Sequence, residues 1–131
     1  MTERPLSPHL SIYRMSRYTL LTSVLNRATG LVLSVGLILL VYWLVAIASG
    51  PAAYSRARAV LSLGVLKAVY IILLAAFSYH LLAGIRHLIW DTGHGLERAQ
   101  AKRSAALLVI CAILLFVGLA WWALHTGARA R

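Results

Sequence analysis

Three long apolar stretches, separated by short polar segments, dominate the pattern of this chain. The first is centred on 31–48, the second is uncharged from 68 to 85, and the third runs from 104 to 124. A helix needs about 20 apolar residues to cross a hydrocarbon layer about 30 Å thick. Strands do not fit, because the apolar residues do not alternate with polar ones and three strands cannot close a barrel. The pattern therefore predicts an all-α integral membrane protein with three transmembrane helices.

The ends of the apolar stretches carry recognisable stop signals. Gly50 and Pro51 end the first span, since proline cannot continue a helix. Trp121 and Trp122 close the third span as aromatic anchors at the membrane interface. We expect a single membrane-anchor domain over 1–131, with these approximate parts: an N-terminal segment 1–27 and spans at 28–49, 60–90 and 104–124.

Composition supports a membrane location and excludes other classes. The chain is 61% hydrophobic and 12% charged, whereas soluble domains carry about 25% charged residues. Its net charge of +10 could suggest nucleic acid, but apolar runs separate the basic residues instead of leaving them on one face. The single cysteine, Cys111, excludes an intrachain disulfide and lies in an apolar run, as a small hydrophobe would.

The basic residues also predict an orientation. Eight of the 13 Lys and Arg residues lie on one side: four in the N-terminal segment, three in the link between spans two and three, and Arg86 near the end of span two. The positive-inside rule then places the N-terminus in the cytoplasm and the C-terminus outside. Residues 1–27 resemble neither a secretory signal peptide nor a mitochondrial transit peptide. We therefore expect a multi-pass protein of the bacterial inner (cytoplasmic) membrane.

His80 is the ionisable residue that lies deepest in an apolar stretch. It precedes Arg86 by six residues, or about 9 Å along a helix. Ionisable groups at such depth are candidate functional residues. One interpretation is a neutral histidine that bonds to a neighbouring helix; the other is an axial ligand of haem iron. Ala83 and Gly84, on the same helical face, would leave a shallow patch for a flat macrocycle.

The face of His80 continues towards the membrane edge through His87 and Asp91. His87 and an arginine could bind the propionates of a haem there, or Arg86, His87 and Asp91 could form an interfacial ion cluster. A six-coordinate haem at His80 would need its second ligand from another polypeptide, because the other histidines lie outside the apolar spans: His9, His94 and His125.

A second polar cluster lies where the chain enters the first span. Ser23, Asn26, Arg27 and Gly30 share one helical face, because they are spaced at 0, 3, 4 and 7. The serine hydroxyl and the guanidinium could bind a quinone carbonyl or a propionate. Alternatively, the cluster is a helix entry with an arginine that snorkels to the surface. Gly30 and Ser34 could also accept a close helix neighbour.

Together these segments resemble the cytochrome b membrane-anchor subunits of succinate dehydrogenase, the respiratory succinate:quinone oxidoreductase. The likeness rests on RPLSPHLSIY at 4–13, on SVLNRATG at 23–30 and on HLLAGIRHLIWD at 80–91. The last stretch is similar to the haem-ligand motif of the family along nearly its whole length. Chain length and the three-span layout agree as well.

The resemblance implies roles for individual residues. His80 corresponds to the axial ligand of haem b, and thus to the metal ligand of this subunit. Ser23 and Arg27 correspond to positions at the ubiquinone site, and Arg27 also to one near a haem propionate. His87 corresponds to a histidine at the propionate edge. The chain departs from the family at Asn26, where histidine is usual, so any proton-handling role of that histidine is in doubt here.

The resemblance further implies a four-subunit complex. A flavoprotein with FAD would oxidise succinate, an iron–sulfur protein would relay electrons, and two small membrane subunits would bind haem b and reduce ubiquinone. This chain would be one half of a heterodimeric helix bundle, without a complete active site of its own. Two alternatives are the anchor of a fumarate reductase and a structural anchor that has no cofactor.

A small transporter is a further alternative of a different class. It would normally carry a carboxylate inside the membrane. The three acidic residues lie outside the spans or at their edges: Glu3, Asp91 and Glu97. The sequence therefore lacks the carboxylate that a proton-coupled transporter would need inside its spans.

Overall fold

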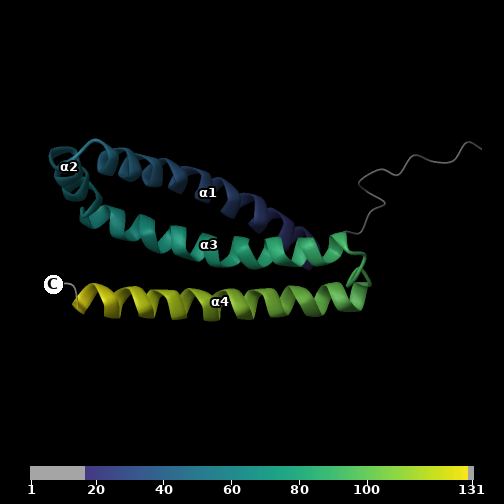
Figure 1. The fold of residues 1–131 in the computed structure, drawn as a ribbon. Coiled ribbons are helices and arrows are strands. Elements are labelled where there is room, and N and C mark those ends of the chain that lie inside the picture. Colours follow the sequence, from purple (N-terminus) through teal and green to yellow (C-terminus); the bar gives the residue numbers. More distant parts are fainter. Residues whose placement is uncertain (1–16, 130–131) are drawn as a thin grey trace, which may run out of the picture.

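The chain folds into helices throughout the part that the structure, a computed structural model, describes, which is residues 17–129 (Figure 1). The N-terminal motif at 4–13 lies outside these residues. The helices have the following bounds: α1 Arg17–Ala48, α2 Pro51–Leu61, α3 Gly64–Asp91 and α4 Arg98–Arg129.

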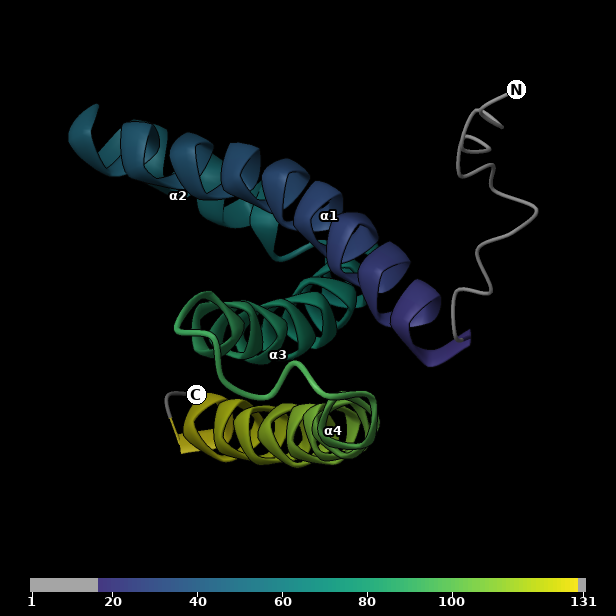
Figure 2. The same cartoon turned by 90° about the vertical axis from the view of Figure 1, so that its right-hand side faces the viewer.

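Three of these helices are long and apolar enough to cross a membrane, over Leu20–Ala48, Gly64–Asp91 and Arg98–Thr126. The predicted all-α fold with three transmembrane helices is thus confirmed. Both views of the ribbon place α3 between α1 and α4 (Figures 1 and 2). α3 and α4 run side by side in opposite directions, whereas α1 crosses α3 at an angle (Figure 2).

The short helix α2 is a feature that the sequence analysis missed. The second span was expected from about residue 60, but residues 60 and 61 belong to α2 and α3 begins at Gly64. Gly50 turns the chain with a φ of 97°, which glycine adopts without strain. Pro51 then stands in the first turn of α2, where its missing N–H costs no hydrogen bond. The proline that ends one helix thus begins the next.

The outer helices begin earlier than the apolar stretches. α1 starts at Arg17 and α4 at Arg98, instead of at about 28 and 104. The helical backbone therefore continues beyond the expected spans at this end of the bundle. As a result, Ser23, Asn26 and Arg27 lie within a helix and not in a loop that leads to one.

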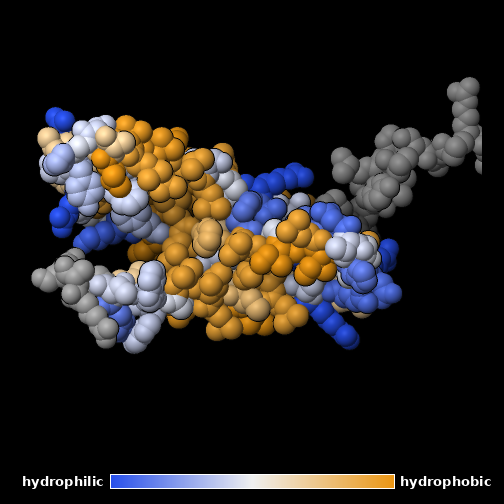
Figure 3. Space-filling view, viewed as in Figure 1, coloured by the Kyte–Doolittle hydropathy of each residue, from blue (hydrophilic) through white to orange (hydrophobic). Residues whose placement is uncertain are grey.

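Small residues account for most of the buried positions on α3 and α4. The buried positions include Ala76 and Ala83 on α3 and Ala105 and Ala112 on α4. Small side chains let two helices approach closely in a membrane. Most apolar residues remain unburied: in the most apolar window of α1 only 6% of the residues are buried. Hydrophobic residues accordingly cover the middle of the face shown in Figure 3. Lipid or other membrane helices must cover this surface.

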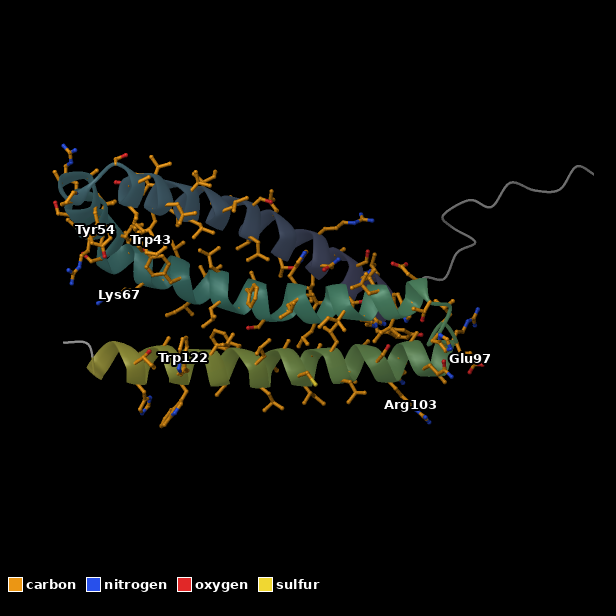
Figure 4. The ribbon with its side chains drawn as sticks, viewed as in Figure 1. Trp43, Tyr54, Lys67, Glu97, Arg103 and Trp122 are labelled. Carbon is orange, nitrogen blue, oxygen red and sulfur yellow. The ribbon has the colours of Figure 1, made fainter. Side chains whose placement is uncertain are left out.

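The two ends of the bundle differ in their side chains (Figure 4). We call the end where α1 begins, α3 ends and α4 begins the site end, and the opposite end, with α2, the α2 end. Glu97 and Arg103 lie at the site end. The aromatic and basic residues labelled at or near the α2 end are Trp43, Tyr54, Lys67 and Trp122. Aromatic rings and basic groups are typical of membrane interfaces.

Candidate functional site

His80 lies on α3 where this helix meets α1. Its Nδ1 is 3.1 Å from the backbone carbonyl oxygen of Asn26 and 3.2 Å from the hydroxyl oxygen of Thr29. A carbonyl oxygen can only accept, so this hydrogen bond requires the proton to be on Nδ1. In the neutral imidazole Nε2 then carries a lone pair, and the described residues give this atom no hydrogen-bond partner. A histidine held in this way is ready to ligate a metal through Nε2.

A glycine allows the imidazole ring to pack directly on α1. A Cβ atom at Gly30 would lie 3.1 Å from Cε1 of His80, which is closer than an ordinary contact. Of the patch expected beside His80, Ala83 is only 2% exposed and therefore already covered by this chain. At Gly84, in contrast, no atom lies within 4 Å of the place that a Cβ would take. Only the Gly84 part of the expected patch is open.

Asn26 contributes an acceptor that this chain does not use. Its Oδ1 is buried, and no described residue donates a hydrogen bond to it. A buried acceptor without a donor costs about 1–3 kcal/mol. This cost is removed when a donor from another molecule reaches the amide. The same residue thus orients His80 through its backbone and offers its side chain to a further group.

Ser23 and Arg27 lie one helical turn apart on α1. Ser23 is half-buried and Arg27 is exposed. Neither forms a hydrogen bond or an ion pair within the part of the chain that the structure describes, including with His80. Both polar groups are therefore available to a ligand, and neither forms a hydrogen bond with the histidine.

His87 and Asp91 lie at the membrane edge of the same helix, and both are exposed. The Nδ1 of His87 is 2.7 Å from the carbonyl oxygen of Ala83, on its own helix. Its ring lies 5.4 Å from the ring of Trp90, centroid to centroid. The alternative of an ion cluster between Arg86, His87 and Asp91 is not realised, because Arg86 turns to α4.

Arg86 is the one buried charged residue in the part of the chain that the structure describes, with 6% of its surface exposed. Its Nε donates to the hydroxyl of Ser104 at 3.0 Å, and its Nη2 donates to the carbonyl of Ala101 at 2.9 Å. The guanidinium also lies 3.9 Å from the ring centroid of Trp90, a cation–π contact. Arg86 thereby fixes the start of α4 against the end of α3.

Two tyrosines complete the cross-links at this end. The hydroxyl of Tyr79, the neighbour of His80, donates to the carbonyl of Thr22 at 3.1 Å. The hydroxyl of Tyr18 lies 3.4 Å from the carbonyl of Arg98, which links α1 to α4. Sequence reasoning missed Thr29 and Tyr79. The contact between Arg86 and Trp90 could have been predicted from the sequence, because residues four positions apart are neighbours on a helix.

His80 would act as a single ligand. Among the described residues, no three His, Cys, Asp or Glu side chains come together in a group that could hold a metal ion. Fold and site thus define a class: a multi-pass helical membrane protein that presents a histidine between two of its helices.

Comparison with known proteins narrows this class. The chain matches the family model of succinate dehydrogenase/fumarate reductase transmembrane subunits over residues 1–120. It is 43% identical over 119 residues to the succinate dehydrogenase cytochrome b556 subunit of Paracoccus denitrificans, with 87% of each chain covered. It is 34% identical over 113 residues to the b556 subunit of Rickettsia felis, with 86% of this chain and 87% of that protein covered.

A mitochondrial relative shows the same similarity. The chain is 36% identical over 121 residues to the succinate dehydrogenase cytochrome b560 subunit of Mus musculus, covering 91% of this chain and 71% of that protein. The chain therefore belongs to the family of succinate dehydrogenase/fumarate reductase transmembrane subunits. The resemblance inferred from the three motifs is confirmed.

Proposed function

We propose that this chain is the haem b- and ubiquinone-binding membrane anchor of a succinate:quinone oxidoreductase. The observation that carries the proposal is His80, whose Nδ1 is bound to the carbonyl of Asn26 while Nε2 has no partner among the described residues. The names of the relatives, cytochrome b556 and b560 subunits of succinate dehydrogenase, agree with a haem b at such a residue.

The surroundings of His80 fit a haem. Gly84 leaves open space one turn from the ligand, and the unused Oδ1 of Asn26 can accept a hydrogen bond from another molecule. When bound, the haem supplies a redox-active iron. The chain supplies the imidazole, orients it, and offers Arg27 and His87 as partners for the propionates. Because the described residues offer His80 as a single ligand, a second membrane subunit would supply the other.

We assign the quinone to Ser23 and Arg27. Both side chains lack a partner in the described chain and lie one turn apart at the site end of α1. The hydroxyl and the guanidinium would donate hydrogen bonds to a carbonyl oxygen of ubiquinone. A fixed positive charge there stabilises negative charge that develops on this oxygen as electrons arrive.

The proposed complex contains a flavoprotein with FAD and an iron–sulfur protein besides the two anchors. The site end would face the cytoplasm of a bacterial inner membrane, because it carries the excess of basic residues. The family model covers both succinate dehydrogenases and fumarate reductases. Succinate oxidation is the direction that the names of the relatives favour.

The first test is a reduced-minus-oxidised optical spectrum of the detergent-purified complex, with wild type beside His80→Ala. We expect a b-type haem signal in the wild type that is lost or strongly shifted in the variant. The matched control is His125→Ala, because His125 is exposed and its Nδ1 bonds only to the carbonyl of Trp121 on its own helix. This control should leave the spectrum unchanged.

Each other outcome is informative. An unchanged haem signal in His80→Ala would remove His80 as a ligand. An assembled wild-type complex without haem would reduce the chain to a structural anchor.

The quinone site is tested separately with Arg27→Ala. Electron transfer from succinate to ubiquinone should fall at least tenfold, because the charged donor to the carbonyl is lost. Transfer from succinate to a water-soluble dye that accepts electrons from the partner subunits should remain. Equal loss of both activities would point to failed assembly, and loss of neither would refute the assignment. Arg103→Ala, also exposed, is the control.

A further inference from the structure

Thr29 places one hydroxyl among three partners on two helices. Its Oγ1 lies 2.8 Å from the carbonyl of Leu25, 3.0 Å from the carbonyl of Asn26 and 3.2 Å from Nδ1 of His80. A hydroxyl has one proton and two lone pairs. The two carbonyls can only accept, so the proton of Thr29 serves one of them. The oxygen is then left to accept from Nδ1–H of His80.

The imidazole N–H is therefore shared between two acceptors on α1. One is the carbonyl of Asn26 at 3.1 Å and the other is the hydroxyl of Thr29 at 3.2 Å. Gly30 packs on the same ring from the next position of the helix. Two acceptors together with a steric contact fix both the position of the ring and its plane.

We propose that Thr29 is a positioning residue for the haem ligand. Its hydroxyl orients His80 and, by polarising Nδ1–H, makes Nε2 a stronger base towards the iron. Such outer partners of a ligating histidine fix its tautomer and raise its basicity. The inference rests on the proposed assignment of the haem to His80. It adds a residue that lies outside the haem-ligand motif at 80–91 and to which the sequence analysis gave no role.

The test compares three substitutions in the intact purified complex, with the reduction potential of the haem as the readout. Thr29→Val keeps the shape and removes the acceptor, and Thr29→Ser keeps the acceptor. Ser34→Ala is the matched control: its hydroxyl bonds to the carbonyl four residues before it on α1, as that of Thr29 does, but does not contact His80.

We expect the potential to rise in Thr29→Val, because a less basic ligand favours ferric iron less. The preference for ferric over ferrous iron should fall by up to about tenfold, which corresponds to about 59 mV for one electron. Thr29→Ser and Ser34→Ala should retain the wild-type potential.

A wild-type potential in Thr29→Val would overturn the inference, as would an equal rise in Ser34→Ala. If the valine variant does not assemble, Thr29→Ala, which removes the same hydroxyl with less bulk, must show the rise. Failure of both to assemble, with Thr29→Ser intact, would mark Thr29 as a folding residue and also overturn the inference. Haem retained in His80→Ala would refute the proposed function itself. Haem lost there, with an unshifted Thr29→Val, would refute only the role of Thr29.

Discussion

The two ends of the helix bundle are held together by different forces. At the site end, hydrogen bonds join α1 to α3 through Tyr79 and His80, and α3 to α4 through Arg86. At the α2 end, the corresponding bond among the described residues is that from the hydroxyl of Tyr70 to the carbonyl of Leu61, nine residues away along the chain. Directional bonds are thus concentrated around His80.

The α2 end instead contains an apolar hollow between α1 and α3. It has a volume of about 390 Å³ and is lined by residues such as Leu33, Leu37 and Leu40 on α1 and Leu73 and Phe77 on α3. Acyl chains or apolar helices can fill such a space in many arrangements. The comparison teaches that this chain fixes its geometry with hydrogen bonds at the end where the proposed haem ligand lies. At the other end, apolar surface accounts for most of the contact between α1 and α3.

The largest loss of stability at the site end is expected for Arg86→Met. The substitution removes two charged hydrogen bonds between α3 and α4, each worth about 1.5–3 kcal/mol. We expect the free energy of unfolding to fall by roughly 3 kcal/mol, measured in mixed micelles by tryptophan fluorescence. Arg103→Met is the control, because Arg103 is exposed at the same end (Figure 4). An equal loss in both variants would show that the charge itself matters and not the contacts.

A paired substitution of tyrosines compares the ends directly. Tyr79→Phe removes the bond to the carbonyl of Thr22 at 3.1 Å, and Tyr70→Phe removes the bond to the carbonyl of Leu61 at 2.9 Å. Tyr79 is half-buried whereas Tyr70 is exposed. We expect losses of about 1 and about 0.5 kcal/mol in the same unfolding assay. The reverse order would contradict the view that the site end carries the stabilising bonds.

The smallest net change in stability is expected at Gly30. Alanine in place of glycine inside a helix gains about 1 kcal/mol. Gly118→Ala should show this gain, because no atom of the described chain lies within 4 Å of the new Cβ. Gly30→Ala should show no such gain in stability, since the ring of His80 must shift by a few tenths of an ångström to make room for the new Cβ. A full gain at Gly30, with an unchanged haem spectrum, would show that the ring is not held.

The sequence was sufficient to predict three spans and the position of His80 within one of them, but not the atoms that its ring contacts. The depth of His80 follows from counting apolar residues. The role of Thr29 depends on where α1 crosses α3, which no local pattern contains. An interfacial cluster with Arg86 was one of two alternatives that the sequence left open. The structure places Arg86 against α4 instead, because the direction of its side chain depends on tertiary packing. α2 was missed because it is short and begins at a proline that was interpreted only as a stop.

The separations of these contacts along the chain imply an order of assembly. Arg86 bonds to residues 15 and 18 positions away, whereas His80 and Tyr79 bond to residues 51 to 57 positions away. Closing the shorter loop costs less entropy, so α3 and α4 can pair as a hairpin before α1 docks. The imidazole of His80 acquires its tautomer only in that last step. During biogenesis, a haem ligated at His80 would therefore report that the whole anchor has folded.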